Sequence, residues 1–199
     1  TTQAHDVLIE MEAVADFERC VALLRGGDPG EATRALLSLR DNPQCVDIAR
    51  AVLARSTDGD ALFHALALFR DGALKSWDAR PPNERDAMAS AALDFARGEA
   101  ARNAPPYVTA AAAECFATLW ARGYVDACAA DAHDAAVRRG RDAVVAVAAA
   151  GGAAIVATTL SCLLAELSGV GRTHLGVARA RRAAARHRFG GGGAVACGA

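Results

Sequence analysis

The sequence has few aromatic residues, no paired-cysteine motif and no apolar leader at its start. Phe, Trp and Tyr together make up 5% of the 199 residues. The six cysteines contain no CxxC pair and no regular spacing. Residues 1–12 lack the basic and apolar regions of a signal peptide. We therefore expect a reducing, cytosolic or nuclear setting, in which most of these thiols serve as small core residues.

Motifs that carry chemistry are also missing. The histidines are scattered and form no HExxH, and no serine lies in a GxSxG sequence. The glycine clusters at 26–30 and 190–193 are not followed by Lys and Ser or Thr, and neither follows an expected strand, so a phosphate-binding loop is excluded. The sequence predicts no metal, no cofactor, no small-molecule substrate and no enzymatic activity.

One stretch, residues 143–165, is uncharged and long enough to cross a bilayer. It is rich in alanine and also contains Gly, Thr and Ser, which contribute little to membrane insertion. Small side chains do let neighbouring helices approach closely. We therefore expect a helix buried by other helices, and no membrane insertion.

What the sequence does contain is typical of helices. Alanine dominates, followed by Leu, Val and Arg, and apolar residues recur at spacings of three and four. Leu62, Leu66, Phe69 and Leu74 form one such face, directed toward a core. Turn signals divide the pattern into about eight or nine helices and no strands. The expected ranges are about 6–25, 30–40, 43–55, 61–77, 81–97, 106–122, 125–139, 142–167 and 175–188.

Several helix ends are assigned to particular residues. We expect Asn42 to cap the third helix, with Pro43 in its first turn, where no amide hydrogen is needed. Gly123 is expected to cap the end of the sixth helix, and Gly140 to separate the seventh helix from the eighth.

The expected helices repeat in pairs. Alternate helices begin near residues 43, 83 and 124 and their partners near 61, 106 and 142, a period of about 40 residues that is typical of HEAT and armadillo units. We therefore expect residues 1–176 to form an all-α, α-α superhelix of HEAT or armadillo type. One set of helices in such an array lines a concave surface that suits large partners.

The charge distribution changes near residue 167. All 23 acidic residues lie at or before Glu166. Residues 177–199 read as a separate segment, a basic helix followed by a Gly-rich tail. Its arginines are Arg179, Arg181, Arg182, Arg186 and Arg188. In a helix, Arg179, Arg182 and Arg186 would share one face. Arginines on one face can neutralise phosphates, but the aromatic residues that usually accompany them in nucleic-acid binding are missing. We favour a solvated face, or a tail that is disordered or not native, over nucleic-acid binding.

The order of residues from Ala35 to Asp126 resembles the N-terminal repeats of nuclear export receptors in the importin-β superfamily, and the exportin-4 group most closely. The matching pieces are the leucine-rich helix 35–40, Pro43 and Cys45 leading a helix that ends near Ser56, the segment 62–66 with Trp77 after it, and Arg122-Gly123-Tyr124-Val125-Asp126. Weaker likeness continues through 163–168 and 172–176. The sequence departs from the family in three ways. Several bulky positions are Ala, Ala121 replaces the Lys before Arg122, and the segment after Gly176 loses the expected acidic and aromatic residues.

The resemblance implies a nuclear transport receptor that shuttles between nucleus and cytoplasm. Its partners would be Ran-GTP, protein cargo and nuclear pore proteins, and coupling between two such sites is typically ~1–3 kcal/mol. Polar residues on the inner helices would contact Ran, and helix position points to His64, Arg70, Asp71 and Lys75. The chain is several-fold shorter than a full receptor, so we expect the N-terminal portion of one, or a truncated product.

Two other hypotheses stay open. The chain could be a HEAT or armadillo scaffold with an unrelated protein partner, such as an adaptor of a phosphatase or kinase. Such an adaptor would ignore the nucleotide state of Ran. The chain could also be an RNA-binding helical repeat, whose affinity would fall with salt and depend on residues 179–188.

Overall fold

The computed structural model describes residues 2–98, 103–129, 133–151 and 153–168, and within these ranges the chain forms helices and no strand. The all-α class is therefore confirmed. The α-helices are α1 (Thr2–Gly26), α2 (Pro29–Asp41), α3 (Cys45–Arg55), α4 (Gly59–Lys75), α5 (Pro82–Arg97), α7 (Pro106–Ala129), α8 (His133–Gly151) and α9 (Ala153–Ser168). A short 3-10 helix, η1 (Trp77–Ala79), follows α4.

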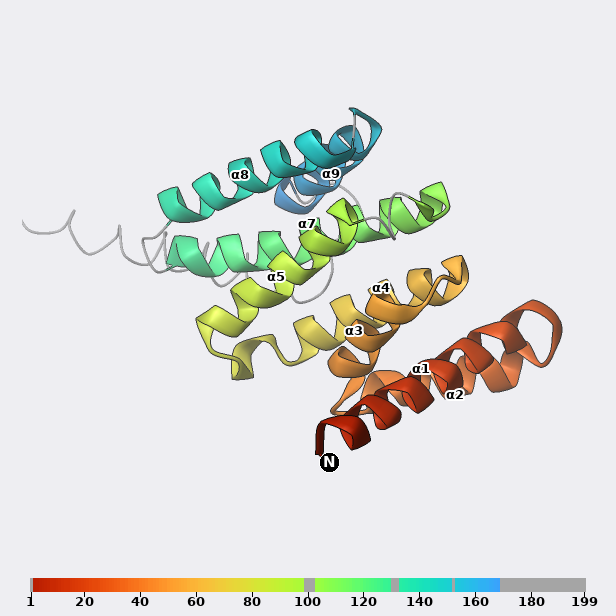
Figure 1. The fold of residues 1–199 in the computed structure, drawn as a ribbon. Coiled ribbons are helices and arrows are strands. Elements are labelled where there is room, and N and C mark those ends of the chain that lie inside the picture. Colours follow the sequence, from red (N-terminus) through yellow and green to blue (C-terminus); the bar gives the residue numbers. More distant parts are fainter. Residues whose placement is uncertain (1, 99–102, 130–132, 152, 169–199) are drawn as a thin grey trace, which may run out of the picture.

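The helices pack as consecutive pairs. α1 contacts α2, α3 contacts α4, α5 contacts α7 and α8 contacts α9. Figure 1 shows these pairs following one another in chain order, from red α1 and α2 to blue α9. The second helices also contact each other in sequence, since α7 packs against α4 on one side and α9 on the other. Among the first helices, α1 contacts α3 and α5 contacts α8.

Carboxylate caps and prolines start several of these helices. The Asp28 carboxylate accepts hydrogen bonds from the backbone N–H of Gly30 (2.8 Å) and Glu31 (3.1 Å), with Pro29 as the first residue of α2. Asp58 caps α4 in the same way. Such a cap typically contributes about 1 kcal/mol, because it satisfies amides that have no partner within the helix.

The start of the third helix differs from the prediction. α3 begins at Cys45, and Pro43 lies in the turn before it. Asn42 does act through its side chain, but its Oδ1 accepts from the backbone N–H of Gln44 at 2.8 Å, ahead of the helix. That hydrogen bond closes a tight Asx turn, which delays the first helical residue.

Two glycines expected to end helices lie inside them instead. Gly123 is within α7, where an added Cβ would lie 3.7 Å from the Trp77 ring. Gly140 is within α8, where an added Cβ would lie 2.3 Å from Cζ2 of Trp120. Each glycine faces a tryptophan, and Gly140 lets two helices approach closely. The predicted cap and break are therefore wrong. At Gly140 the Trp120 ring fills the space of a side chain, whereas Gly123 has room for an ordinary contact with Trp77.

The uncharged stretch 143–165 is divided between two helices. The single helix predicted over 142–167 is wrong, because α8 ends at Gly151 and α9 begins at Ala153. Across the described ranges, no helix combines the length and the apolar character needed to span a membrane.

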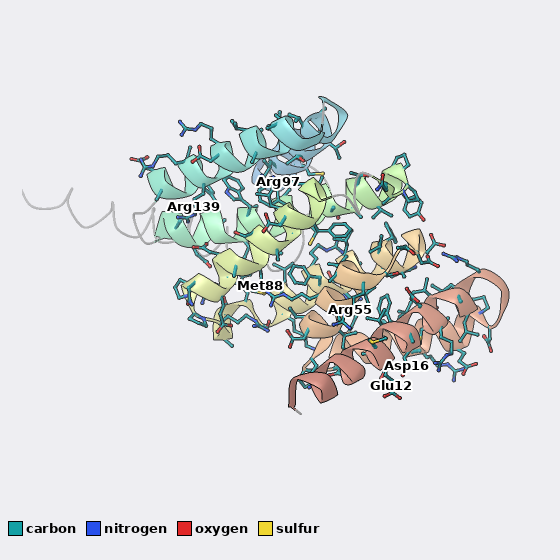
Figure 2. The ribbon with its side chains drawn as sticks, viewed as in Figure 1. Glu12, Asp16, Arg55, Met88, Arg97 and Arg139 are labelled. Carbon is teal, nitrogen blue, oxygen red and sulfur yellow. The ribbon has the colours of Figure 1, made fainter. Side chains whose placement is uncertain are left out.

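A continuous core runs through the first three pairs. Its largest fully buried side chains include Phe17 on α1, Phe69 on α4, Trp77 on η1 and Met88 on α5. Met88 is labelled in Figure 2. Burial of each of these side chains contributes about 1.5–3 kcal/mol. Leu62, Leu66 and Phe69 are buried as predicted, and Leu74 packs against the same core. Small residues bring α3 and α4 together, since a Cβ at Gly72 would lie 2.6 Å from Sγ of Cys45.

Candidate partner-binding groove

A groove runs between α2 and α4 and holds three of the predicted partner-binding residues. It consists of two adjoining hollows of about 280 and 320 Å³. Their shared lining is Leu37, Arg40 and Asp71. His64 lies in the first hollow and Lys75 in the second. We call this feature the α2–α4 groove.

The period of α4 explains why these residues lie together. His64, Asp71 and Lys75 are separated by seven and then four positions, which places them on one face of an α-helix. Apolar side chains also line the groove, including Leu36 and Leu68. Leu37 is 51% exposed there, although leucine is usually buried.

Ion pairs join the two walls of the groove. The Arg40 guanidinium lies 2.6 Å from Oδ2 of Asp71, and Lys75 Nζ lies 2.9 Å from Oδ1 of Asp41. The hydrogen bond from Lys75 holds the pKa of the Asp41 carboxyl below its usual range. Both partners of the Lys75 pair are largely exposed, so its contribution to stability is about 0–1 kcal/mol.

Arg70 extends this network to the third helix pair. Its Nε lies 3.1 Å from Oδ1 of Asp71, and its Nη1 donates a hydrogen bond to Oε1 of Glu114 on α7 at 2.9 Å. Asp71 therefore lies between Arg40 and Arg70. Arg70 is thus a member of the network, but it is not part of the groove lining. The sequence prediction missed Arg40, Asp41 and Glu114, because their proximity depends on how separate helices pack.

His64, which lines the first hollow, lies beside an aromatic pair, Phe63 and Tyr107, that is outside the groove lining. Its ring centroid is 5.4 Å from that of Phe63, at an edge-to-face angle, and Phe63 is 5.8 Å from Tyr107 in a similar arrangement. Burial lowers the pKa of His64, and the Asp60 carboxylate opposes that effect in part. The imidazole is therefore more often neutral at physiological pH than a free histidine would be.

A charged junction that includes Tyr107 links three helix pairs. The Arg25 guanidinium, at the end of α1, donates to Asp58 and Asp60 at 2.5 Å each. The Tyr107 hydroxyl donates to the other oxygen of Asp60, also at 2.5 Å. These hydrogen bonds lower the pKa of both carboxyls and raise that of Tyr107. We refer to this cluster as the Asp58–Asp60 junction.

A second junction joins η1 and α5 to α7 and contains residues of the exportin resemblance. The indole N–H of Trp77 donates to Asp126 at 2.7 Å, and Arg122 pairs with Asp126 and with Asp78. Arg85 of α5 contacts Asp126 at 3.1 Å. The guanidinium of Arg122 also lies over the Trp77 ring, 5.8 Å from its centroid. Trp77, which is far from Arg122 and Asp126 in the sequence, thus forms one contact cluster with them, the Asp126 junction.

Metal-ligating side chains and cysteine thiols are the remaining groups of chemical interest in the described residues. No group of three His, Cys, Asp or Glu residues in the described ranges is placed to hold a metal ion. Burial raises the pKa of the Cys115 thiol to about 12, so it remains protonated. Cys20, Cys45, Cys115 and Cys162 are free thiols, and Cys45 and Cys115 are buried as small core residues.

Several predicted features lie outside the described residues. These are the domain boundary at 176, the 172–176 part of the resemblance, and the basic-tail residues Arg179, Arg181, Arg182, Arg186 and Arg188. Comparisons with models of protein families, with curated proteins and with solved structures found no match.

Proposed function

We propose that this chain is the Ran-binding array of an exportin-4-like nuclear transport receptor. It binds Ran-GTP and protein cargo, contacts nuclear pore proteins and shuttles between nucleus and cytoplasm, without catalysing a reaction. The observation that carries the proposal is the α2–α4 groove. There His64, Asp71 and Lys75, chosen by helix position in the resemblance, lie along one hollowed surface.

We further propose that the array is an α-α superhelix of HEAT or armadillo type. Each pair contacts its neighbours in chain order. From the second pair onward, the second helices begin at Gly59, Pro106 and Ala153, at an interval of 47 residues that is typical of such units. The second helix of the first pair, α2, begins at Pro29 and is closer to its successor. The first helices begin less evenly, at Cys45, Pro82 and His133, because the connections between helices differ in length.

The composition of the groove supports binding to a protein. An interface needs apolar side chains that can be desolvated, surrounded by polar groups that set the orientation of the partner. Leu37 supplies an exposed apolar contact, and Arg40, Asp41, Asp71 and Lys75 surround it with both signs of charge. A folded partner with complementary charges can exchange pairs with these side chains with little change in helix packing.

The test is nucleotide-dependent retention on immobilised Ran. The chain, shown to be folded by circular dichroism, is expected to bind Ran-GTP and not Ran-GDP. Leu37→Asp is expected to weaken retention on the order of tenfold or more, because a charge replaces a desolvated apolar contact. Leu164→Asp is the matched control, since Leu164 is 69% exposed on α9, outside the groove. Failure to bind where a full receptor succeeds would refute the proposal.

The alternative is a HEAT or armadillo scaffold with an unrelated protein partner. The same exposed Leu37 and paired charges would serve such a partner equally well. The retention assay separates the two functions, because a scaffold of this kind would bind neither nucleotide form of Ran.

A further inference from the structure

A separate hollow of about 320 Å³ lies at the boundary between the third and fourth helix pairs, bounded by α5, α7 and α8. Its apolar lining includes Leu93, Phe116, Leu119 and Trp120. None of these residues belongs to the α2–α4 groove. We call it the α5–α8 pocket.

The aromatic wall of this pocket is held in place from two directions. The Trp120 ring stacks on Tyr124 with centroids 5.3 Å apart and planes at 20°. On its other side α8 approaches so closely that even a methyl group at Gly140 would overlap the indole. The pocket is therefore largely formed before any ligand binds, which lowers the entropic cost of binding.

The charges at the pocket favour an anionic ligand. Arg85 is already engaged with Asp126, but Arg97 and Arg139 are available (both labelled in Figure 2). Arg97 has only an exposed, 3.9 Å pair with Asp94, and Arg139 makes no ion pair with any other described residue. Of the two lining carboxylates, Asp142 is paired with Arg141 at 2.9 Å, which leaves Asp86.

We propose that the α5–α8 pocket binds an acidic peptide segment, with one bulky apolar side chain of the segment inserted against Trp120. The volume is at the small end of the range of about 300–1,000 Å³ for ligand pockets, which suits a single anchoring side chain. Carboxylates on either side of that anchor pair with Arg97 and Arg139, and charge-assisted hydrogen bonds to guanidinium groups are among the stronger polar contacts. This site is independent of the proposed Ran contact, because it is built from other helices.

The test is a selection from a display library of random twelve-residue peptides on the full chain. The enriched peptides are expected to carry Asp or Glu around one Leu, Phe, Trp or Met. A synthetic copy of the most enriched peptide is then titrated by fluorescence anisotropy. Absence of enrichment, or enrichment of basic peptides, would overturn the proposal.

Three variants locate the binding site of that peptide. Arg139→Glu is expected to weaken binding on the order of tenfold, because it reverses a charge at the rim. Ser90→Phe, which fills the pocket from α5 without removing a core side chain, is expected to weaken it by at least as much. Arg138→Glu is the matched control, since Arg138 is exposed and does not line the pocket. Equal affinity for all three variants, each verified as folded, would overturn the site.

Retention on Ran-GTP distinguishes this proposal from the function proposed above. Arg139→Glu and Ser90→Phe should leave that retention unchanged. If the chain binds the acidic peptide but not Ran-GTP, the proposed pocket stands and the proposed receptor function is refuted.

Discussion

At the residue scale, three carboxylates connect helix pairs that are distant in the sequence. Asp126 accepts from Trp77, Arg85 and Arg122, while Asp58 and Asp60 share Arg25. A helix start close to Asp58 was predicted from the sequence, because the fourth helix was expected from about residue 61. The capping role of Asp58 itself comes from the structure. The long-range partners of these carboxylates could not be predicted from the sequence, because they depend on which helices pack side by side.

Replacement of Asp126 by alanine is expected to destabilise the fold by about 2–3 kcal/mol. Arg122 is 9% exposed and would lose one of its two carboxylate partners, and the cost of a fully broken buried pair is reduced here because Asp78 remains. Urea unfolding followed by circular dichroism measures the change. Asp94→Ala is the control, because its 3.9 Å exposed pair should contribute less than about 0.5 kcal/mol. Equal effects of the two variants would contradict this view of the Asp126 junction.

The Asp58–Asp60 junction predicts a loss of stability in acid. The hydrogen bond from Arg25 lowers the pKa of the Asp58 carboxyl in the folded state below its ordinary value of 3.8. Its contribution is therefore complete above pH 3.8 and disappears as the pH falls through the lower folded-state pKa. Asp58→Asn keeps a capping side chain but not the charge. Unfolding measured between pH 6 and pH 2 should show a flatter curve for the variant, and parallel curves would contradict the assignment.

At the element scale, prolines located several helix starts, whereas Pro43 and two glycines were assigned wrongly. Pro29, Pro82 and Pro106 each lie at the first position of a helix, where proline has no hydrogen bond to lose. Gly123 and Gly140 are of the residue type that usually ends a helix, but both lie in helix interiors and face tryptophans. Local sequence cannot separate a glycine that ends a helix from one that admits a neighbouring ring, because the ring comes from another helix.

These two glycines give a matched pair of opposite predictions. Gly140→Ala is expected to destabilise the protein by about 1–3 kcal/mol, since its Cβ would overlap Trp120 and force α8 away. Gly123→Ala is expected to be neutral or to stabilise by up to about 1 kcal/mol, because its Cβ meets Trp77 at an ordinary 3.7 Å and alanine favours a helix. Thermal unfolding of both variants measures the two changes in stability. If both variants were destabilised, or both stabilised, the placement of these helices would be contradicted.

At the scale of the whole molecule, the sequence predicted the all-α class and the pairing of α3 with α4 and of α5 with α7, because apolar spacing and turn residues are local. It placed the last pair wrongly, at 125–139 and 142–167, where the structure has α8 and α9. Of the four α4 residues predicted to share a surface, His64, Asp71 and Lys75 line the groove and Arg70 does not. The sequence did not predict that α2 would form the opposite wall of the groove, or that α5 and α8 would enclose a pocket around Trp120. Both features arise where pairs meet, and only the packing of several helices defines them.

The α2–α4 groove can be tested directly because Lys75, which lines it, is the only lysine in the sequence. An amine-reactive crosslinker therefore has one side-chain target in the chain, and Lys75→Arg removes that target while keeping the charge. Crosslinking to Ran followed by peptide mass spectrometry should give a Lys75 product with Ran-GTP, and none with Ran-GDP or with Lys75→Arg. A Ran-GTP complex without a Lys75 crosslink, or equal crosslinking in both nucleotide states, would contradict the groove as the Ran-binding surface.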